Sequence, residues 1–413
     1  MLMEVFWLIS GNNRNKFTIL IFTIHNLNMK KIVFFLIASL LFISEIFAQK
    51  SIVVTNSSGL DRKGEIVEVK AGHKKSCKLP ESFVLKSIDG KEIAYQLIYN
   101  DLKIITGFIF QADVNAKSTA TYMLTEGKPA IVKAKTFGRF VPERKDDFAW
   151  ENDFAAYRMY GPALAKENPS NGVDYWAKKT EELIVDEFYN GELKQGLSYH
   201  RDRGQGLDFY KVGHTLGCGG IAPYAADSLW VGNHYNTYKV LENGPLRTVF
   251  TLSYDSVKVG NEFYKQTITI TATAGSLLNK AVVTYTGKAQ KMQLATGIFL
   301  HDDKGSLVSH LKSTKNNSKP TSRIGYAEEA ISVFNEPSGR NYVGVVVSSE
   351  GNIQLKKKGI HAMLLSDYNV GKSFTYYFGG GWNNWKYPAD NDWFNALEEY
   401  SIKVSSPLKV KLK

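Results

Sequence analysis

Alternating apolar and hydroxyl-bearing side chains are the feature that most limits the folds open to this chain. In the segment FYKQTITITATAG, residues 263–275, Ile268 and Ile270 fall on one side of an extended backbone, and Thr267 and Thr269 fall on the other. A period of two predicts a strand with one buried face. Long stretches with a helical period are nearly absent from the 413 residues. The chain is therefore predicted to be all-β.

Two dipeptides indicate hairpins between such strands. Gly260 and Asn261 separate two alternating runs, and Asp89 and Gly90 separate two more. These pairs favour tight turns between antiparallel strands. Only short helices are expected, near residues 155–164 and 393–400. The pattern indicates a large antiparallel β-sandwich, supersandwich-like, with few short helices.

A change of composition near residue 135 divides the chain into two regions. Short strands fill residues 49–135, whereas Trp, His and Gly become frequent after that point. We expect a small N-terminal β-sandwich over residues 49–135 and a large antiparallel β-sheet catalytic domain over residues 136–413. The two regions can also pack as one unit.

Residues 1–48 have the pattern of a leader. Lys30 and Lys31 follow Met29, an apolar run covers residues 32–43, and Ala48 precedes a plausible cleavage point. This order is typical of a secretory signal peptide over residues 29–48. The alternative is a membrane anchor, but the apolar run is shorter than the roughly 20 residues that a span needs. The true start is Met29, or the leader is unusually long. The mature protein is expected in the periplasm, with no membrane span after cleavage.

The charge of the chain is basic. Cleavage after Ala48 removes four Lys or Arg and two Asp or Glu, which lowers the formal charge of +11 by two, to +9. No basic helix or zinc-finger spacing indicates nucleic acid, so an anionic extracellular polymer is the expected partner. The alternative is that the lysines serve only solubility. The two cysteines, Cys77 and Cys218, are expected to be free.

The segment YHRDRGQGLDFYKVGHTLGCGG, residues 199–220, combines titratable side chains, aromatic rings and glycines. If residues 198–203 are extended, His200 and Asp202 share one face, while Tyr199, Arg201 and Arg203 share the other. A carboxylate near an imidazole can orient the ring. Nearby arginines favour the phenolate form of a tyrosine. Either arrangement suits proton abstraction. The alternative is a surface hairpin whose charges pair with each other.

Upstream, the segment ERKDDFAWENDFAAYRMYGPAL carries a second concentration of charge. Arginine can grip a carboxylate or sulfate with two parallel hydrogen bonds, and an exposed tryptophan gives a sugar ring a flat apolar surface. The alternative is a charged linker with a core tryptophan. The residues in question are Arg144, Trp150, Glu151, Asp153 and Arg158.

Weaker signals lie further along the chain. His234 stands alone, and His301 precedes Asp302 and Asp303, which is a possible cation site or an ordinary turn. The close pair of histidines typical of zinc sites is missing, so no metal is predicted. The C-terminal segment YYFGGGWNNWKYPADNDWF contains Trp382 and is rich in aromatic residues. It suits either the wall of a carbohydrate cleft or a cap on the core. No phosphate-binding loop, dinucleotide fingerprint or nucleophile elbow is present, and no cofactor is predicted.

Four of these segments resemble a family of secreted bacterial proteins of unknown function from polysaccharide-utilisation systems. The resemblance rests on ERKDDFAWENDFAAYRMYGPAL, GVDYWAKK, YHRDRGQGLDFYKVGHTLGCGG and YYFGGGW, in this order, and covers nearly the whole mature chain. The family includes an ulvan oligosaccharide dehydratase. The resemblance implies removal of water from a terminal glucuronate or iduronate, which leaves a 4,5-unsaturated uronyl end. Other members occur beside pectin-degrading enzymes, so the substrate can differ.

That reaction needs a base for the C5 proton, an acid for the departing hydroxyl and a cation for the carboxylate. We expect His200 or Tyr210 as the base and His214 as the acid. The expected carboxylate holder is Arg144, Arg158 or Lys211. Residues expected to line the sugar and sulfate subsites are Trp150, Glu151, Asp153, Arg203, His234 and Trp382.

Two alternatives stay open on the sequence. A polysaccharide lyase performs the same elimination with a sugar as the leaving group, and sequence does not separate it from a dehydratase. A non-catalytic protein that binds anionic glycans would use the Trp and Arg residues without the proton-transfer groups.

Overall fold

The computed structural model describes residues 5–8, 19–22, 50–72, 79, 82–167, 169–311, 320–348 and 351–413. The expected signal peptide, residues 29–48, lies outside the described residues, and so does Cys77. In a first compact unit, Met1–Gln49, strand β1 (Val5–Leu8) pairs antiparallel with β2 (Ile19–Phe22). Among the described helices, none combines the length and the apolar composition that a membrane crossing needs.

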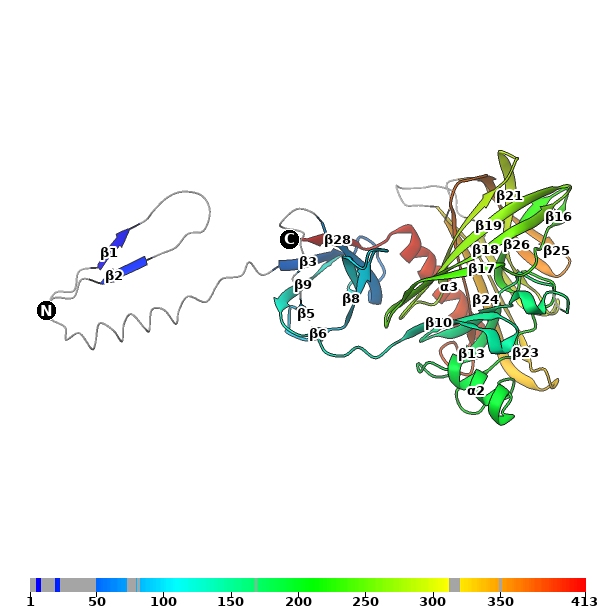
Figure 1. Ribbon diagram of the computed structural model, residues 1–413, viewed down its shortest axis with the longest axis horizontal. Helices are drawn as coiled ribbons and strands as arrows, with labels where there is room; N and C mark the ends of the chain where they lie inside the picture. The colour runs from blue at the N-terminus through cyan, green and yellow to red at the C-terminus, as the bar shows by residue number, and fades with distance from the viewer. Residues whose placement is uncertain are drawn as a thin grey trace. The chain divides into compact units, whose positions relative to one another are not determined.

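Lys50–Lys413 forms the second compact unit, and its first part is a pair of small antiparallel sheets with a shared apolar core. The C-terminal strand of the chain pairs beside β3 in the larger of these sheets, so the N-terminal region is completed by the far end of the sequence (Figure 1). The five-stranded sheet has the order β28 (Lys409–Leu412), β3 (Lys50–Thr55), β9 (Thr119–Glu126), β5 (Phe83–Ser87), β6 (Glu92–Ile93). The three-stranded sheet has the order β4 (Arg62–Lys70), β8 (Ile105–Val114), β7 (Tyr95–Tyr99).

Three further antiparallel sheets make up the rest of the unit and share one extended core. The eight-stranded sheet has the order β17 (Thr237–Asn243), β18 (Arg247–Val259), β19 (Glu262–Thr273), β20 (Asn279–Thr286), β27 (Phe374–Trp382), β24 (Pro337–Ser348), β23 (Thr321–Ile331), β22 (Ser306–Leu311). A five-stranded sheet has the order β16 (Ser228–Leu229), β15 (Cys218–Ala225), β21 (Lys291–Phe299), β26 (His361–Asn369), β25 (Ile353–Lys358). The other has the order β10 (Thr136–Val141), β11 (Asp147–Asn152), β12 (Ala155–Met159), β13 (Asp174–Lys178), β14 (Gly206–Leu207).

The strand predictions from alternation are confirmed. Ile268 and Ile270 are buried on β19, and both hairpins form at the predicted dipeptides, between β18 and β19 and between β5 and β6. The all-β prediction is therefore confirmed. The boundary near residue 135 stays a prediction, because Lys50–Lys413 is one compact unit.

The helix expected at residues 155–164 is wrong. Its first half is β12, and only a short 3₁₀ turn, Pro162–Leu164, follows; a similar turn, Pro142–Arg144, precedes β11. Every residue of β12 is buried, because Tyr157 faces the main core and Ala156 faces a second apolar cluster on the other side. A strand covered on both faces shows no alternation, so the sequence pattern was ambiguous.

Within the described residues, two α-helices cover outer faces of the sheets. Helix α3 (Asp390–Ser405) includes the predicted segment 393–400 and packs Trp393 and Leu397 against the face of β24 opposite the main core. Helix α2 (Val185–Gln195) was missed. Its Val185, Phe188 and Tyr189 have the helical i, i+3, i+4 spacing, and they pack against the β10–β14 sheet.

Candidate functional site

Residues 198–205 form a turn after α2 rather than the extended segment considered above. The Asp202 carboxylate organises this turn, since it accepts hydrogen bonds from the backbone N–H groups of Gly204 and Gly206 at 2.8 and 3.2 Å and pairs with Lys179. His200 and Asp202 therefore do not share a strand face. The turn directs Tyr199 into the interior, while Arg201 and Arg203 stay exposed.

Arg158 lies at the centre of a buried group of charges, here called the arginine cluster: Arg144, Arg158, Asp147, Asp174 and Asp208. The pairing of β12 with β13 places Arg158 directly opposite Asp174, and their Nε and Oδ2 atoms are 2.5 Å apart. The same guanidinium donates to Asp208 Oδ2 at 3.0 Å and to the Tyr199 hydroxyl at 3.1 Å. Because its side chain is only 4% exposed, Arg158 positions protein groups and does not reach a substrate.

The cluster has more carboxylates than guanidinium groups. Asp147, Asp174 and Asp208 are all buried and face only two arginines. Burial first, and then repulsion from Asp174, raises the pKa of Asp208 well above its ordinary value. Burial likewise raises the pKa of Asp147. The cluster therefore retains a proton to a higher pH than free carboxyl groups do.

Arg144 is the guanidinium of the cluster that reaches solvent. It ends the 3₁₀ turn before β11, its side chain is 25% exposed, and its nearest carboxylate oxygen, on Asp147, is 4.0 Å away. Its buried Nη1 atom has no hydrogen-bond partner among the residues that the structure describes. This Nη1 atom is the one that faces Asp147, so an incoming acceptor would have to bind the exposed part of the guanidinium.

His200 lies beside the cluster with its ring partly exposed. Its Nδ1 atom is 2.8 Å from the backbone oxygen of Asp208 and 3.6 Å from Asp208 Oδ2. Because a carbonyl oxygen only accepts, Nδ1 carries the hydrogen of the neutral ring and Nε2 keeps its lone pair. Burial, aided by the charge of Arg158, lowers the pKa of His200 below 6.5. The imidazole is thus neutral at neutral pH and able to accept a proton at Nε2.

Residues 208–216, here called the histidine strip, contact His301 and His361. The Tyr210 ring centroid is 4.7 Å from that of His301, and His301 Nε2 lies 2.8 Å from the backbone oxygen of Lys211. His301 Nδ1 lies 2.6 Å from buried Glu328, so both ring nitrogens have partners. This histidine therefore anchors the strip.

Tyr210 is poorly placed to act as a base. It is buried, its hydroxyl has no hydrogen-bond partner among the described residues, and burial raises its pKa well above the ordinary value. The phenolate is thereby disfavoured. The Lys211 side chain, in contrast, is exposed.

His214 lines a different cavity. It is exposed and borders a space of about 450 Å³ together with Trp230 and His361. The Leu216 N–H group donates to His361 Nε2 at 3.2 Å, and burial, with the charge of His214, lowers the pKa of His361 to about 4. The contacts within the described chain do not join His214 to His200, so the expected base and acid are not brought together.

Three predicted substrate contacts prove to be core residues. Trp150 is fully buried and donates from Nε1 to Asn279 Oδ1 at 3.0 Å, so it offers no surface to a sugar. Glu151 pairs with Lys178 at 2.9 Å and accepts from the N–H groups at the start of α2. Asp153 accepts from the N–H of Gly275 at 2.7 Å. These assignments are corrected: the three side chains stabilise the fold.

The other predicted lining residues are divided between core and surface. Trp382 is 3% exposed and donates to Ser338 at 2.6 Å, and His234 is 7% exposed with its ring centroid 6.2 Å from that of Tyr160. Neither reaches solvent freely. Arg203 is exposed, donates to the Ser198 carbonyl at 2.9 Å and borders a cavity of about 310 Å³.

The structure also identifies residues that sequence reasoning missed. Asp174 and Asp208 lie inside the quoted segments GVDYWAKK and GLDFYKVGH, yet nothing in their spacing linked them to Arg158. Glu328 lies outside those segments altogether. The available signal was an acidic residue within an otherwise apolar strand. Such a residue is rarely buried without a partner.

Glycines in the segment are required by close packing. Gly217 has φ = +59°, and a Cβ there would lie 2.2 Å from the Val173 carbonyl oxygen. Gly219 has φ = +103°, and a Cβ there would lie 2.3 Å from the Phe378 side chain. The backbone after the histidine strip can therefore approach β27 and residue 173 only without side chains.

The possible cation site at His301, Asp302 and Asp303 does not assemble. Asp302 accepts from the N–H groups of Lys304 and Gly305, while His301 turns to Glu328. Within the described ranges, no three His, Cys, Asp or Glu side chains are grouped so that they could hold a metal ion. Cys218 is buried and forms no disulfide within the described residues, whereas the prediction for Cys77 falls outside them.

Two solved structures are distantly similar to this chain. A glycosyl hydrolase family 38 protein from Enterococcus faecalis matches 89% of this chain and 48% of its own length, with 9% identity and a TM-score of 0.47. An α-mannosidase from E. faecalis V583 matches 88% of this chain and 46% of its own, with 9% identity and a TM-score of 0.41. The chain thus spans about half the length of these solved chains.

Sequence comparison gives a nearer relative. An uncharacterized protein P7 from Formosa agariphila is 29% identical over 385 residues, which cover 87% of this chain and 93% of the relative. The profile of the family described as domain of unknown function DUF4861 matches residues 54–410. This match spans the small sheets, the arginine cluster and α3, and the chain belongs to the DUF4861 family.

Proposed function

We propose that the protein is a dehydratase that removes water across C4 and C5 of a uronic acid at the non-reducing end of an oligosaccharide, of the ulvan type. The observation that carries the proposal is the pairing of His200 Nδ1 with the Asp208 carbonyl, which leaves Nε2 as a partly exposed proton acceptor. The resemblance of the quoted segments to a family with this activity supports the same reaction.

The carboxylate of the substrate has to be neutralised before its C5 proton becomes acidic. Arg144 suits this role, because it is the partly exposed guanidinium of the arginine cluster, beside which His200 lies. Arg158 is excluded from it by its three hydrogen bonds and its burial. A guanidinium in place before the reaction stabilises the enediolate as its charge develops.

One histidine can carry out both proton transfers of the reaction. His200 Nε2 takes the C5 proton, the C5 electron pair forms the C4=C5 double bond, and the C4–O bond breaks. In glucuronate, the C5 hydrogen and the C4 oxygen lie on the same face of the ring. The imidazolium can therefore return its proton to the leaving oxygen, which departs as water and leaves His200 neutral. His214 is not needed in this scheme.

Saturated oligosaccharides with a glucuronate end, prepared from ulvan and from glucuronate-containing pectins, test the proposal. The expected product has lost the mass of one water, keeps all its sugars and absorbs in the ultraviolet as a conjugated enoate. His200→Ala abolishes the change, whereas His310→Ala, an exposed histidine on β22, serves as the matched control with normal activity. Unchanged product mass for every substrate would refute the proposal, and shortening of the intact polymer would identify a lyase instead.

A further inference from the structure

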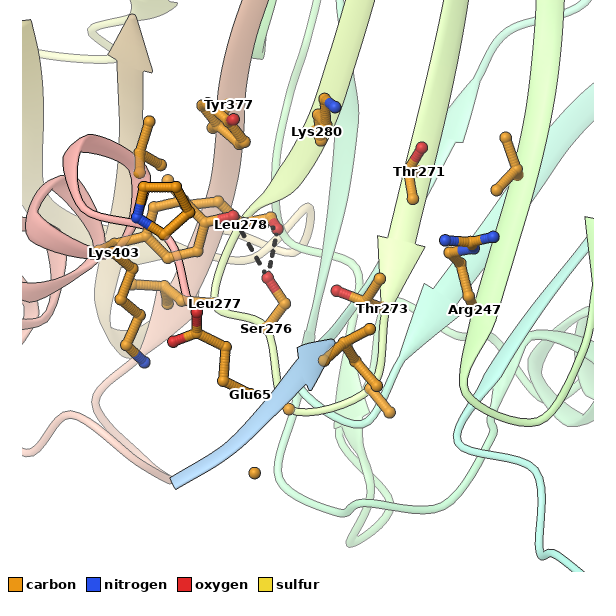
Figure 2. A pocket seen from close by; sticks show the side chains of 18 of the residues that line it. Glu65, Arg247, Thr271, Thr273, Ser276, Leu277, Leu278, Lys280, Tyr377 and Lys403 are labelled. Carbon is orange, nitrogen blue, oxygen red and sulfur yellow. Dashed lines mark hydrogen bonds between the residues drawn. The ribbon is translucent and has the colours of Figure 1, made fainter. Parts of the chain in front are cut away.

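A cavity of about 590 Å³ lies away from the arginine cluster and the histidine strip and shares no lining residue with them. Its wall comes from β4, the adjoining strands β18 and β19, the loop at residues 274–278, β20, β27 and the end of α3 (Figure 2). The volume falls within the range of about 300–1,000 Å³ that small-ligand pockets have. Segments distant in sequence thus form one ligand-sized space.

Two lysines supply positive charge to this cavity. Lys280 is exposed on β20, Lys403 lies in the last turn of α3, and Figure 2 shows them at separate places on the lining. Within the part of the chain that the structure describes, neither ammonium group has a carboxylate partner. Because an anion would not have to displace an existing ion pair, both lysines are available to a ligand.

The other charges of the cavity are already paired. Arg247 binds Glu242 at 2.7 Å and Glu68 at 3.0 Å, and Glu65 binds Arg62 at 2.8 Å. Lys280 and Lys403 therefore decide which charge the cavity attracts.

Hydroxyl groups and aromatic rings complete the lining. Thr271, Thr273 and Ser276 contribute hydroxyls, and the rings of Tyr377 and Tyr400 meet edge to face with centroids 5.6 Å apart. Sugars offer hydroxyl groups on their edges and C–H groups on their faces, which fit hydroxyl side chains and aromatic rings respectively. Together with free ammonium groups, this lining matches a sugar that bears anionic groups.

We propose that this cavity binds an anionic oligosaccharide, whose sulfate or carboxylate groups contact Lys280 and Lys403 while a sugar ring lies against Tyr377. An ammonium on a flexible stem binds such groups as a point charge and tolerates different positions of the anion. The site is separate from the proposed catalytic residues and does not depend on the proposed reaction. A second contact with the same polymer would raise the effective concentration of its end at His200.

Isothermal titration of the full chain tests the proposal with four probes: a carrageenan tetrasaccharide, which has sulfate but no uronate, a tetragalacturonate, neutral cellotetraose and inorganic sulfate. The carrageenan probe cannot undergo uronate dehydration, so its binding is independent of the proposed function. We expect both anionic tetrasaccharides to bind and cellotetraose not to bind. The double variant Lys280→Gln/Lys403→Gln should weaken their binding at least about tenfold, which corresponds to about 1.4 kcal/mol.

The matched control is Lys265→Gln on β19, which removes an exposed lysine outside the cavity and should bind as the unchanged protein does. Equal melting temperatures show that the variants are folded. Failure of both anionic tetrasaccharides to bind, equal binding of cellotetraose, or unchanged binding by the double variant would each overturn the proposal. Inorganic sulfate that binds as tightly as the tetrasaccharides would also overturn it, because the cavity would then be a site for a free anion.

Discussion

The Nδ1 atom of His200 and the backbone oxygen of Asp208 are 2.8 Å apart, while the carboxylate of the same Asp208 binds Arg158 at 3.0 Å. One residue thus joins the partly exposed imidazole to the buried charges through two different groups. The backbone oxygen fixes the tautomer of His200, and the side chain fixes the position of that backbone. The orientation of the proposed base therefore depends on residues that no substrate touches.

The pH dependence of activity should follow the lowered pKa of His200. The base acts only when neutral, so kcat/KM should decline at low pH with a midpoint below 6.5, because burial lowers the pKa of this histidine from its ordinary value. His200→Gln should reduce kcat by about 100- to 10,000-fold. Initial rates across pH, measured by the enoate absorbance, check both expectations. A midpoint at or above pH 6.5 would assign the base to another group.

The two arginines of the cluster should respond differently to replacement. Arg144→Ala removes a donor that we place on the substrate carboxylate, so kcat should fall by about 100- to 1,000-fold with little change in melting temperature. Arg144→Lys should restore only part of the rate, since an ammonium lacks the two parallel donors.

Arg158→Met, in contrast, leaves Asp174 and Asp208 buried without their partner. Removing one member of a buried ion pair lowers the free energy of unfolding by about 3–5 kcal/mol. Thermal denaturation and single-turnover rates on both variants separate these effects. Normal turnover by Arg144→Ala would remove it from the site.

Asp208→Asn should flatten the pH dependence of stability. The folded protein holds the Asp208 proton more tightly than the unfolded chain, whose pKa is near 3.8, so this group's contribution to stability is present at low pH and declines as pH rises above 3.8. Asparagine has no proton to lose and keeps the backbone oxygen that His200 contacts. Melting temperatures from pH 4 to pH 8 should therefore decline less in the variant. Parallel curves for the two proteins would contradict the raised pKa.

Two glycines with positive φ allow the cost of a left-handed backbone to be distinguished from the cost of a steric clash. Gly219→Ala places a Cβ about 2.3 Å from Phe378 at φ = +103°, whereas Gly371→Ala, at φ = +84°, meets nothing within 4 Å. The second change should cost only the left-handed conformation, roughly 1 kcal/mol. The first should cost several times more, because β27 has to move. Equal losses in urea unfolding would show that Phe378 relocates freely.

The sequence predicted those parts of the molecule whose signal is local. Ile268 and Ile270 alternate with threonines along β19. Both the strand and the side chains that it buries could therefore be predicted from neighbouring residues. Tyr157 and Ala156 on β12 gave no such signal, because both faces of that strand are covered. Arg144, Arg158 and His200 were named from the sequence as site residues, and the structure places His200 beside the arginine cluster, but the contact of Arg158 with Asp174 depends on the β12–β13 register, which no local pattern encodes.

Stereochemistry gives the sharpest test of a mechanism with one histidine. In iduronate the C5 hydrogen lies on the ring face opposite the C4 oxygen, so His200 could remove the proton but could not return it to the leaving group. Oligosaccharides ending in glucuronate should therefore react at least about tenfold faster than matched oligosaccharides ending in iduronate, measured as kcat/KM by the enoate absorbance. Deuterium at C5 of the glucuronate end should lower kcat/KM, because the hydrogen that His200 moves to the leaving oxygen comes from C5 and not from the solvent. Equal rates for the two epimers would require a second proton donor, and the exposed side chain of Lys211 would then be the first to replace.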